Sequence, residues 1–132
     1  MNRPLVTIEL DHTECDPGDR LTGTYAVDPE TRPLATHVEV AVYWATEGKG
    51  DEDRAIQYRK RGSTADGALF DGDGAGRFAI RLPAAPLSYD GLLVKIVWYV
   101  QVRVTFSGGG ESEATAPFRL GRVGAVAEVE NV

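Results

Sequence analysis

The sequence predicts an all-β fold, an antiparallel β-sandwich of about seven or eight strands. Apolar side chains recur at every second position in several segments, which is the period of a strand with one buried and one solvated face. Clusters of glycine, proline and aspartate separate these segments. No long stretch shows the period of about 3.6 residues that an amphipathic helix requires.

The first five predicted strands share this alternation. Asp16-Pro-Gly-Asp19 precedes the second of them and Asp28-Pro-Glu30 follows it, as expected for turns. Each strand is therefore expected to present one face to a common core. The inward residues, strand by strand, are Val6, Ile8 and Leu10; Leu21, Tyr25 and Val27; Val38, Val40, Val42 and Trp44; Ile56 and Tyr58; and Phe78, Ile80 and Leu82.

The longest alternation runs from Leu92 to Phe106 and predicts a strand that crosses the full height of the sandwich. Trp98 lies on its apolar side and is expected to fill the core. The opposite side offers Tyr99, Gln101 and Arg103 as candidate contact residues. The inward series is Val94, Ile96, Trp98, Val100, Val102, Val104 and Phe106.

A last strand is expected from Ser112 to Leu120. Pro117 lacks an N–H within it, which favours an edge position or a bulge. These strands make one sandwich domain over residues 1–120. Residues 121–132 are expected to form either an extra edge strand or a disordered tail, and the sequence leaves both open.

Composition excludes several classes of function. The 132 residues carry a formal net charge of −6, which argues against general nucleic-acid binding and against charge-driven recruitment to a membrane. A single cysteine, Cys15, excludes an internal disulfide. No window approaches the roughly 20 apolar residues of a transmembrane segment, and no secretory signal is evident. We expect a cytoplasmic protein without a cofactor.

Groups that could perform catalysis are few and scattered. His12 and His37 are the only histidines, and neither has an evident partner for general-base catalysis. Ser88 lacks the Gly-x-Ser-x-Gly context of an activated nucleophile. His12 and Cys15 offer only two of the four ligands that a structural zinc needs. The sequence therefore predicts a protein that is not an enzyme.

An acidic, glycine-rich stretch is one candidate ligand site. Asp66, Asp71 and Asp73 lie among glycines, and carboxylates with this kind of spacing can surround a calcium ion. The stretch lacks the later bidentate glutamate of a helix-loop-helix calcium site. Because Asp-Gly pairs also form tight turns, a turn without an ion is the simpler interpretation.

The second candidate is the one basic cluster, Arg59, Lys60 and Arg61, with Arg54 nearby. Such a cluster can receive an acidic peptide, a phosphate group or a lipid headgroup. Charged residues on an edge strand also discourage aggregation between sheets. The sequence favours this second interpretation.

Two linked segments resemble the arrestin-like fold family, an immunoglobulin-like sandwich. Pro17–Gly23 resembles the opening of that fold's second strand. Phe78–Gly91 is similar to the passage that leads into a long strand with an aromatic pair, here Trp98-Tyr99 within Leu92–Phe106. Prolines that end one strand and a glycine that admits the next give this pattern a physical basis. Bacterial sporulation-control proteins share this fold.

The resemblance implies a non-catalytic scaffold or adaptor that binds proteins. Arrestin-like proteins usually carry two sandwiches, whereas this sequence accounts for one, and it lacks the tandem lysines of a receptor-tail phosphate sensor. Receptor binding is therefore not inferred. We expect a partner, or a second copy in a homodimer, to bind by strand pairing at an exposed edge. The alternative is an ion-binding or anion-binding module built on Asp66–Asp73 or on Arg59–Arg61.

Overall fold

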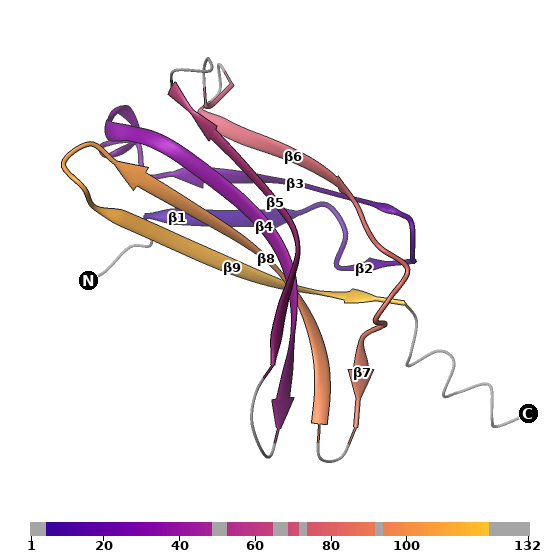
Figure 1. Ribbon diagram of the computed structural model, residues 1–132. Coiled ribbons are helices and arrows are strands. Elements are labelled where there is room, and N and C mark those ends of the chain that lie inside the picture. The colour runs from indigo at the N-terminus through magenta and orange to yellow at the C-terminus, as the bar shows by residue number, and fades with distance from the viewer. Residues whose placement is uncertain (1–4, 49–52, 65–68, 72–73, 92–93, 122–132) are drawn as a thin grey trace, which may run out of the picture.

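The computed structural model describes residues 5–48, 53–64, 69–71, 74–91 and 94–121. Two β-sheets pack face to face in a sandwich (Figure 1). The smaller sheet has the order β1-β3-β6, and the larger has the order β2-β9-β8-β4-β5, with β7 also paired to β8. The strands are β1 (Val6–Leu10), β2 (Glu14–Cys15), β3 (Arg20–Val27), β4 (Ala35–Gly48), β5 (Arg54–Ser63), β6 (Ala75–Arg81), β7 (Tyr89–Asp90), β8 (Val94–Phe106) and β9 (Glu111–Leu120).

The all-β sandwich predicted from the sequence is confirmed. Arg32–Leu34 form a turn of 3-10 helix, and no helix among the described residues is long and apolar enough to cross a membrane. The two-residue strands β2 and β7 are additions to the prediction, because such short strands show no alternation. The β2–β9 pairing is parallel, whereas the prediction was wholly antiparallel.

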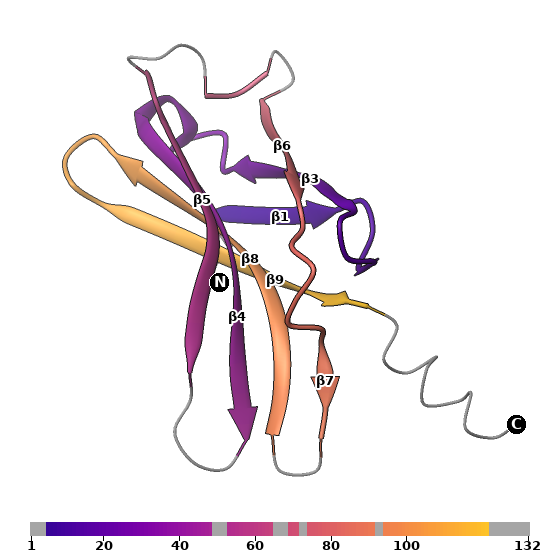
Figure 2. The ribbon, with the colours of Figure 1, turned by 45° about the vertical axis from the view of Figure 1, so that its right-hand side comes forward.

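The core lies between the sheets and is centred on β8, as the alternation predicted. Trp98, Val100, Val102 and Val104 are all fully buried there. Figures 1 and 2 show that the ends of β4, β5 and β8 beside β7 extend past the three-stranded sheet. The larger sheet therefore has a part that the smaller sheet does not cover.

The crossover from β6 to β8 is fastened to the core by two side chains. The indole Nε1 of Trp98 donates a hydrogen bond to the carbonyl oxygen of Pro86 at 2.7 Å. The buried Ser88 hydroxyl accepts the Leu120 N–H at 2.8 Å, and the Ser88 N–H donates to the Leu120 carbonyl oxygen. The passage that carried the sequence resemblance is therefore hydrogen-bonded to both β8 and β9.

One predicted orientation is wrong. Ile56 and Tyr58 were both expected to face the core, but β5 contains a bulge. Val42 of β4 is opposite Tyr58 and Tyr43 is opposite Ile56, so Gln57 is an additional residue between them. A bulge shifts the alternation by one residue. Ile56 therefore lies on the Tyr43 face of the sheet, where its side chain is exposed.

Candidate interaction surface

The basic cluster of the sequence lies on β5, the edge strand of the larger sheet. Within the described residues, β5 pairs with β4 alone. Alternation divides the cluster between the two faces of the sheet. Arg59 and Arg61 lie on the outer face, where Arg59 forms an ion pair with Glu39 at 3.8 Å. Lys60 lies on the inner face. The cluster is thus a basic edge rather than one cationic patch.

The backbone groups of Arg59 and Arg61 point away from β4. In an antiparallel pair, residues bonded to the partner strand alternate with residues whose N–H and C=O face away from it. The Thr46 N–H donates to the Asp53 carbonyl oxygen at 2.8 Å, so the even-numbered residues of β4 face β5. Val40 and its partner Lys60 are therefore bonded to each other. Arg59 and Arg61 consequently offer their backbone donors and acceptors to an added strand.

A cleft opens between the two sheets beside this edge. It has a volume of about 450 Å³. Its lining includes two basic residues: Lys60, which has no ion-pair partner within the described part of the chain, and Arg77, which pairs with Asp71. Its walls are mainly apolar and come from β3, β4, β5 and β6: Tyr25, Val38, Val40, Tyr58, Gly62, Leu69, Phe78, Ala79 and Ile80. The cleft can therefore receive apolar side chains from a segment bound along β5.

Sequence reasoning did not identify this cleft. The available signal was the inward series of the β5 segment, which continues from Tyr58 to Lys60 and Gly62 instead of to larger apolar residues. A charged and a very small residue at inward positions leave space in a core. The sequence could not show that β6 lies across that space, because β5 and β6 belong to different sheets.

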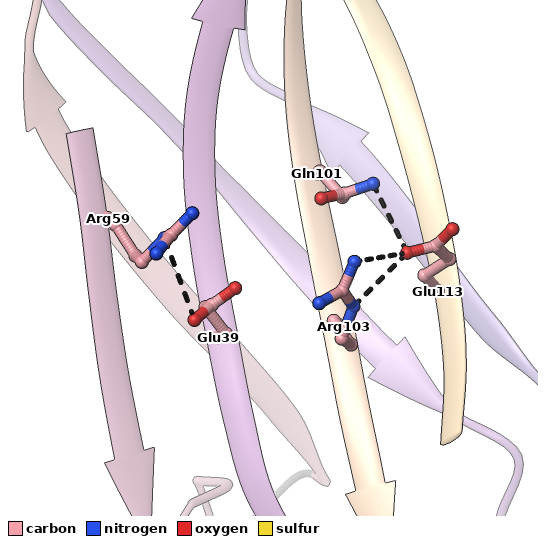
Figure 3. A network of polar contacts seen from close by, with 5 residues as sticks. All are labelled: Glu39, Arg59, Gln101, Arg103 and Glu113. Atoms are coloured by element: carbon pink, nitrogen blue, oxygen red, sulfur yellow. Dashed lines mark hydrogen bonds and ion pairs between the residues drawn. The ribbon is translucent and has the colours of Figure 1, made fainter. Parts of the chain in front are cut away.

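The outer face of the larger sheet brings together the other predicted contact residues. Figure 3 shows Gln101 and Arg103 converging on Glu113, while Arg59 reaches Glu39 on the neighbouring strand. Arg103 lies 3.2 Å from the Glu113 carboxylate, and Gln101 donates to the same oxygen at 3.2 Å. These side chains satisfy one another, so this face has fewer free polar groups than the sequence suggested.

The aromatic residues of this face are also packed together. Tyr99 stacks on Tyr43 with ring centroids 5.3 Å apart, and its hydroxyl bonds to Glu47. The Arg54 guanidinium lies 4.4 Å from the centre of the Tyr43 ring, within the range of a cation–π interaction. Among the described strands, none lies over this outer face, because the smaller sheet packs against the opposite side.

The predicted calcium loop falls largely outside the described residues, since Asp66 and Asp73 are not among them. Asp71 is described, and its carboxylate pairs with Arg77. The Gly74 N–H donates to the Asp71 carbonyl oxygen at 2.8 Å. The described residues contain no group of three side chains that could hold a metal ion.

The groups considered for catalysis are far from being activated. Cys15 is buried, and desolvation, reinforced by the charges of Asp19 and Asp16, raises the pKa of its thiol above its ordinary value. Such a thiol is protonated at neutral pH and a poor nucleophile. The Ser88 hydroxyl is engaged by the backbone of Leu120. His37 contacts the hydroxyl of its neighbour Thr36 at 3.0 Å.

The buried Cys15 thiol is expected to make the free energy of unfolding depend on pH in the alkaline range. Because the folded-state pKa of Cys15 is raised, its contribution is complete below the unfolded pKa and is lost as pH rises through the folded value. We expect the free energy of unfolding to decrease as pH rises from 9.0, the ordinary pKa of a cysteine thiol, towards 10.0. The interval ends at 10.0 because that is the ordinary pKa of Tyr25, and burial raises the pKa of Tyr25 as well. Urea titrations of the wild type and Cys15→Ala would measure this. The Cys15→Ala curve should be shallower over that interval, and parallel curves would contradict the assignment.

Comparison with known proteins places the fold. No protein-family model matches the chain, and no curated protein matches it. Among solved structures, the chain is similar to Spo0M, a sporulation control protein from Bacillus subtilis, with a TM-score of 0.62 at 13% sequence identity. The fold is arrestin-like. The match covers 96% of this chain and 54% of the Spo0M chain, so the arrestin-like sandwich here spans about half the length of that structure.

Proposed function

We propose that this arrestin-like sandwich is a non-catalytic interaction module that binds an extended peptide segment by strand addition at β5. The observation that carries the proposal is the combination of an edge open within the described residues with an apolar cleft directly beside it. Backbone pairing to such an edge supplies affinity, and pockets for alternate side chains supply specificity. In this sandwich, the open edge of β5 and the apolar cleft lie side by side.

The chemistry of the edge favours an acidic segment. The chain has a formal net charge of −6, yet three consecutive residues of this edge are basic. Within the described residues, neither Lys60 nor Arg61 has an ion-pair partner. A carboxylate brought beside Arg61 on the outer face gains a favourable interaction without first displacing another one.

A regulatory role without catalysis is consistent with the remaining observations. The Cys15 thiol is buried, which raises its pKa, and the Ser88 hydroxyl is held by the backbone of Leu120. Spo0M, which has a similar fold, is described as a sporulation control protein. By this analogy of fold, the module would act by holding a partner and not by modifying it.

A proline at the edge tests the mode of binding. The Arg61 N–H points away from β4, so Arg61→Pro removes a donor from the open edge without removing a ladder hydrogen bond. We expect peptides selected from a displayed random library on the wild type to lose at least about tenfold in affinity for Arg61→Pro. Fluorescence polarisation with the selected peptides would measure the loss.

Arg61→Ala is the matched control because it removes the same charge but keeps the N–H. Its affinity should fall only about threefold, as for loss of one exposed charge pair. If both variants bind the selected peptides equally well, strand addition at β5 is refuted. Circular dichroism would establish that both variants are folded.

A further inference from the structure

We propose that the segment that binds at β5 is the chain's own segment Val126–Glu130, supplied by a second copy, so that two copies exchange these segments in a homodimer. This inference rests on the proposed function, since it names the occupant of the same edge. It is carried by three observations: the two-sided chemistry of β5, the matching alternation in the sequence of Val126–Glu130, and the distance from Gly121, the last described residue, to β5.

The two faces of β5 impose different requirements on an added strand. Side chains beside Arg59 and Arg61 lie on the outer face and meet two cations. Side chains on the other face enter the cleft between Tyr58, Gly62 and the β6 side. A complementary strand therefore alternates between acidic and apolar residues. The cleft, of about 450 Å³, has room for small apolar side chains from such a strand.

The sequence Val126-Ala-Glu-Val-Glu130 has this alternation. Ala127 and Val129 fall on one side of an extended chain, and both are small and apolar. Glu128 and Glu130 fall on the other side and would lie beside Arg59 and Arg61. Opposite charges on neighbouring strands stabilise a pair, whereas like charges destabilise it. The five residues therefore satisfy both requirements at once.

The segment cannot reach β5 of its own copy in this arrangement. One row of paired residues crosses the sheet from β9 to β5: Phe118, Trp98, Trp44 and Ala55. Gly121 follows Phe118 along the chain, so it lies beyond this row at the β9 side of the sheet, away from β5. An added strand beside Lys60 would lie four strand spacings from Gly121 across the sheet and seven residue steps from it along the strands. The distance between Gly121 and that position is roughly 25–30 Å. Glu128 follows Gly121 by seven residues, which span at most about 25 Å when straight. A straight path would pass through the strands of the sheet, so the chain would need a longer route than its seven residues can span. The segment that occupies β5 must therefore come from a second copy.

Charge exchange between two variants tests the proposal. One variant carries Glu128→Arg and Glu130→Arg, and the other carries Arg59→Glu and Arg61→Glu. Both are made with Glu39→Gln, as is the reference chain, so that the reversed edge does not meet a like charge beside it. Sedimentation velocity over a range of concentrations would give the dimer dissociation constant of each.

The reference chain should form a dimer, and each variant alone should dimerise at least about tenfold more weakly, because its segment and edge then carry the same sign. An equimolar mixture should regain the affinity of the reference, since each segment now meets an edge of opposite charge. A monomeric reference chain, variants that dimerise unchanged, or a mixture without recovery would each overturn the proposal.

Hydrogen exchange on the wild type provides a test that needs no substitution. The amides of Arg59 and Arg61 face the open edge, so their exchange should slow at least about tenfold as concentration rises through the dimer dissociation constant. Unchanged exchange in a dimer would place the interface elsewhere. If library peptides bind wild type but not Arg61→Pro while the wild type stays monomeric, only the identity of the occupant is wrong. If Arg61→Pro and Arg61→Ala behave alike, the proposed function itself fails.

Discussion

Replacing Trp98 with alanine is expected to lower the free energy of unfolding by about 3–5 kcal/mol. Trp98 is 0% exposed, and its ring lies 5.9 Å from that of Phe118 between centroids. Truncation removes buried apolar surface and leaves a cavity between rigid strands. It also removes the donor for the Pro86 carbonyl oxygen, which otherwise accepts at 2.7 Å. Both effects act at the point where the crossover joins β8.

Trp44→Ala is the matched control for this substitution. Trp44 lies directly opposite Trp98 on β4 but is only partly buried. We expect Trp44→Ala to lower the free energy of unfolding by less than half as much as Trp98→Ala, because Trp44 buries less apolar surface on folding. Urea denaturation followed by far-ultraviolet circular dichroism would give both values. Equal losses would show that Trp98 does not have the central position in the core that its burial indicates.

Trp98→Phe separates the hydrogen bond from the packing. The phenyl ring retains much of the apolar volume but has no donor for Pro86. A loss of about 1–3 kcal/mol is expected, which is the cost of an unpaired buried acceptor. A loss as large as that of Trp98→Ala would assign the effect to the hydrogen bond instead of the cavity.

The strands of the fold could be predicted because alternation is a local property of the sequence. β8 is the best example, since its seven apolar positions define both its length and its inner face. The bulge at Gln57 could not be predicted, because an extra residue is visible only against the partner strand. Ile56 therefore appeared to be a core residue. The short strands β2 and β7 are determined by their neighbours, β9 and β8, and not by their own residues.

The candidate site was only half predictable. The sequence showed a basic cluster and indicated an edge strand, and β5 is an edge of the larger sheet within the described residues. It could not show how Arg59, Lys60 and Arg61 divide between the outer face and the cleft. That division depends on which face of β5 meets the smaller sheet. The cleft itself depends on two strands from different sheets, and no local pattern relates Tyr58 to Phe78.

Gly76→Ala should also lower the free energy of unfolding, by about 1–3 kcal/mol. Gly76 lies opposite Tyr25 on the neighbouring strand, and a methyl group there would overlap the Tyr25 ring. That ring cannot simply move aside. Its edge packs on Phe70 with centroids 6.0 Å apart, and its hydroxyl donates to the Leu69 carbonyl oxygen at 3.3 Å. The glycine thus gives the ring its position in the wall of the cleft.

Gly62→Ala is the control on the opposite wall, where an added methyl group would make only ordinary contact with Leu69 at 3.6 Å. We expect a change within about 0.5 kcal/mol there. If the Tyr25 ring causes the cost at Gly76, then Gly76→Ala should cost much less in a Tyr25→Ala background. Urea denaturation of the four chains of this double-mutant cycle would measure the coupling. Strictly additive effects would mean that the glycine is required for some property of the β6 backbone and not for the ring that lies on it.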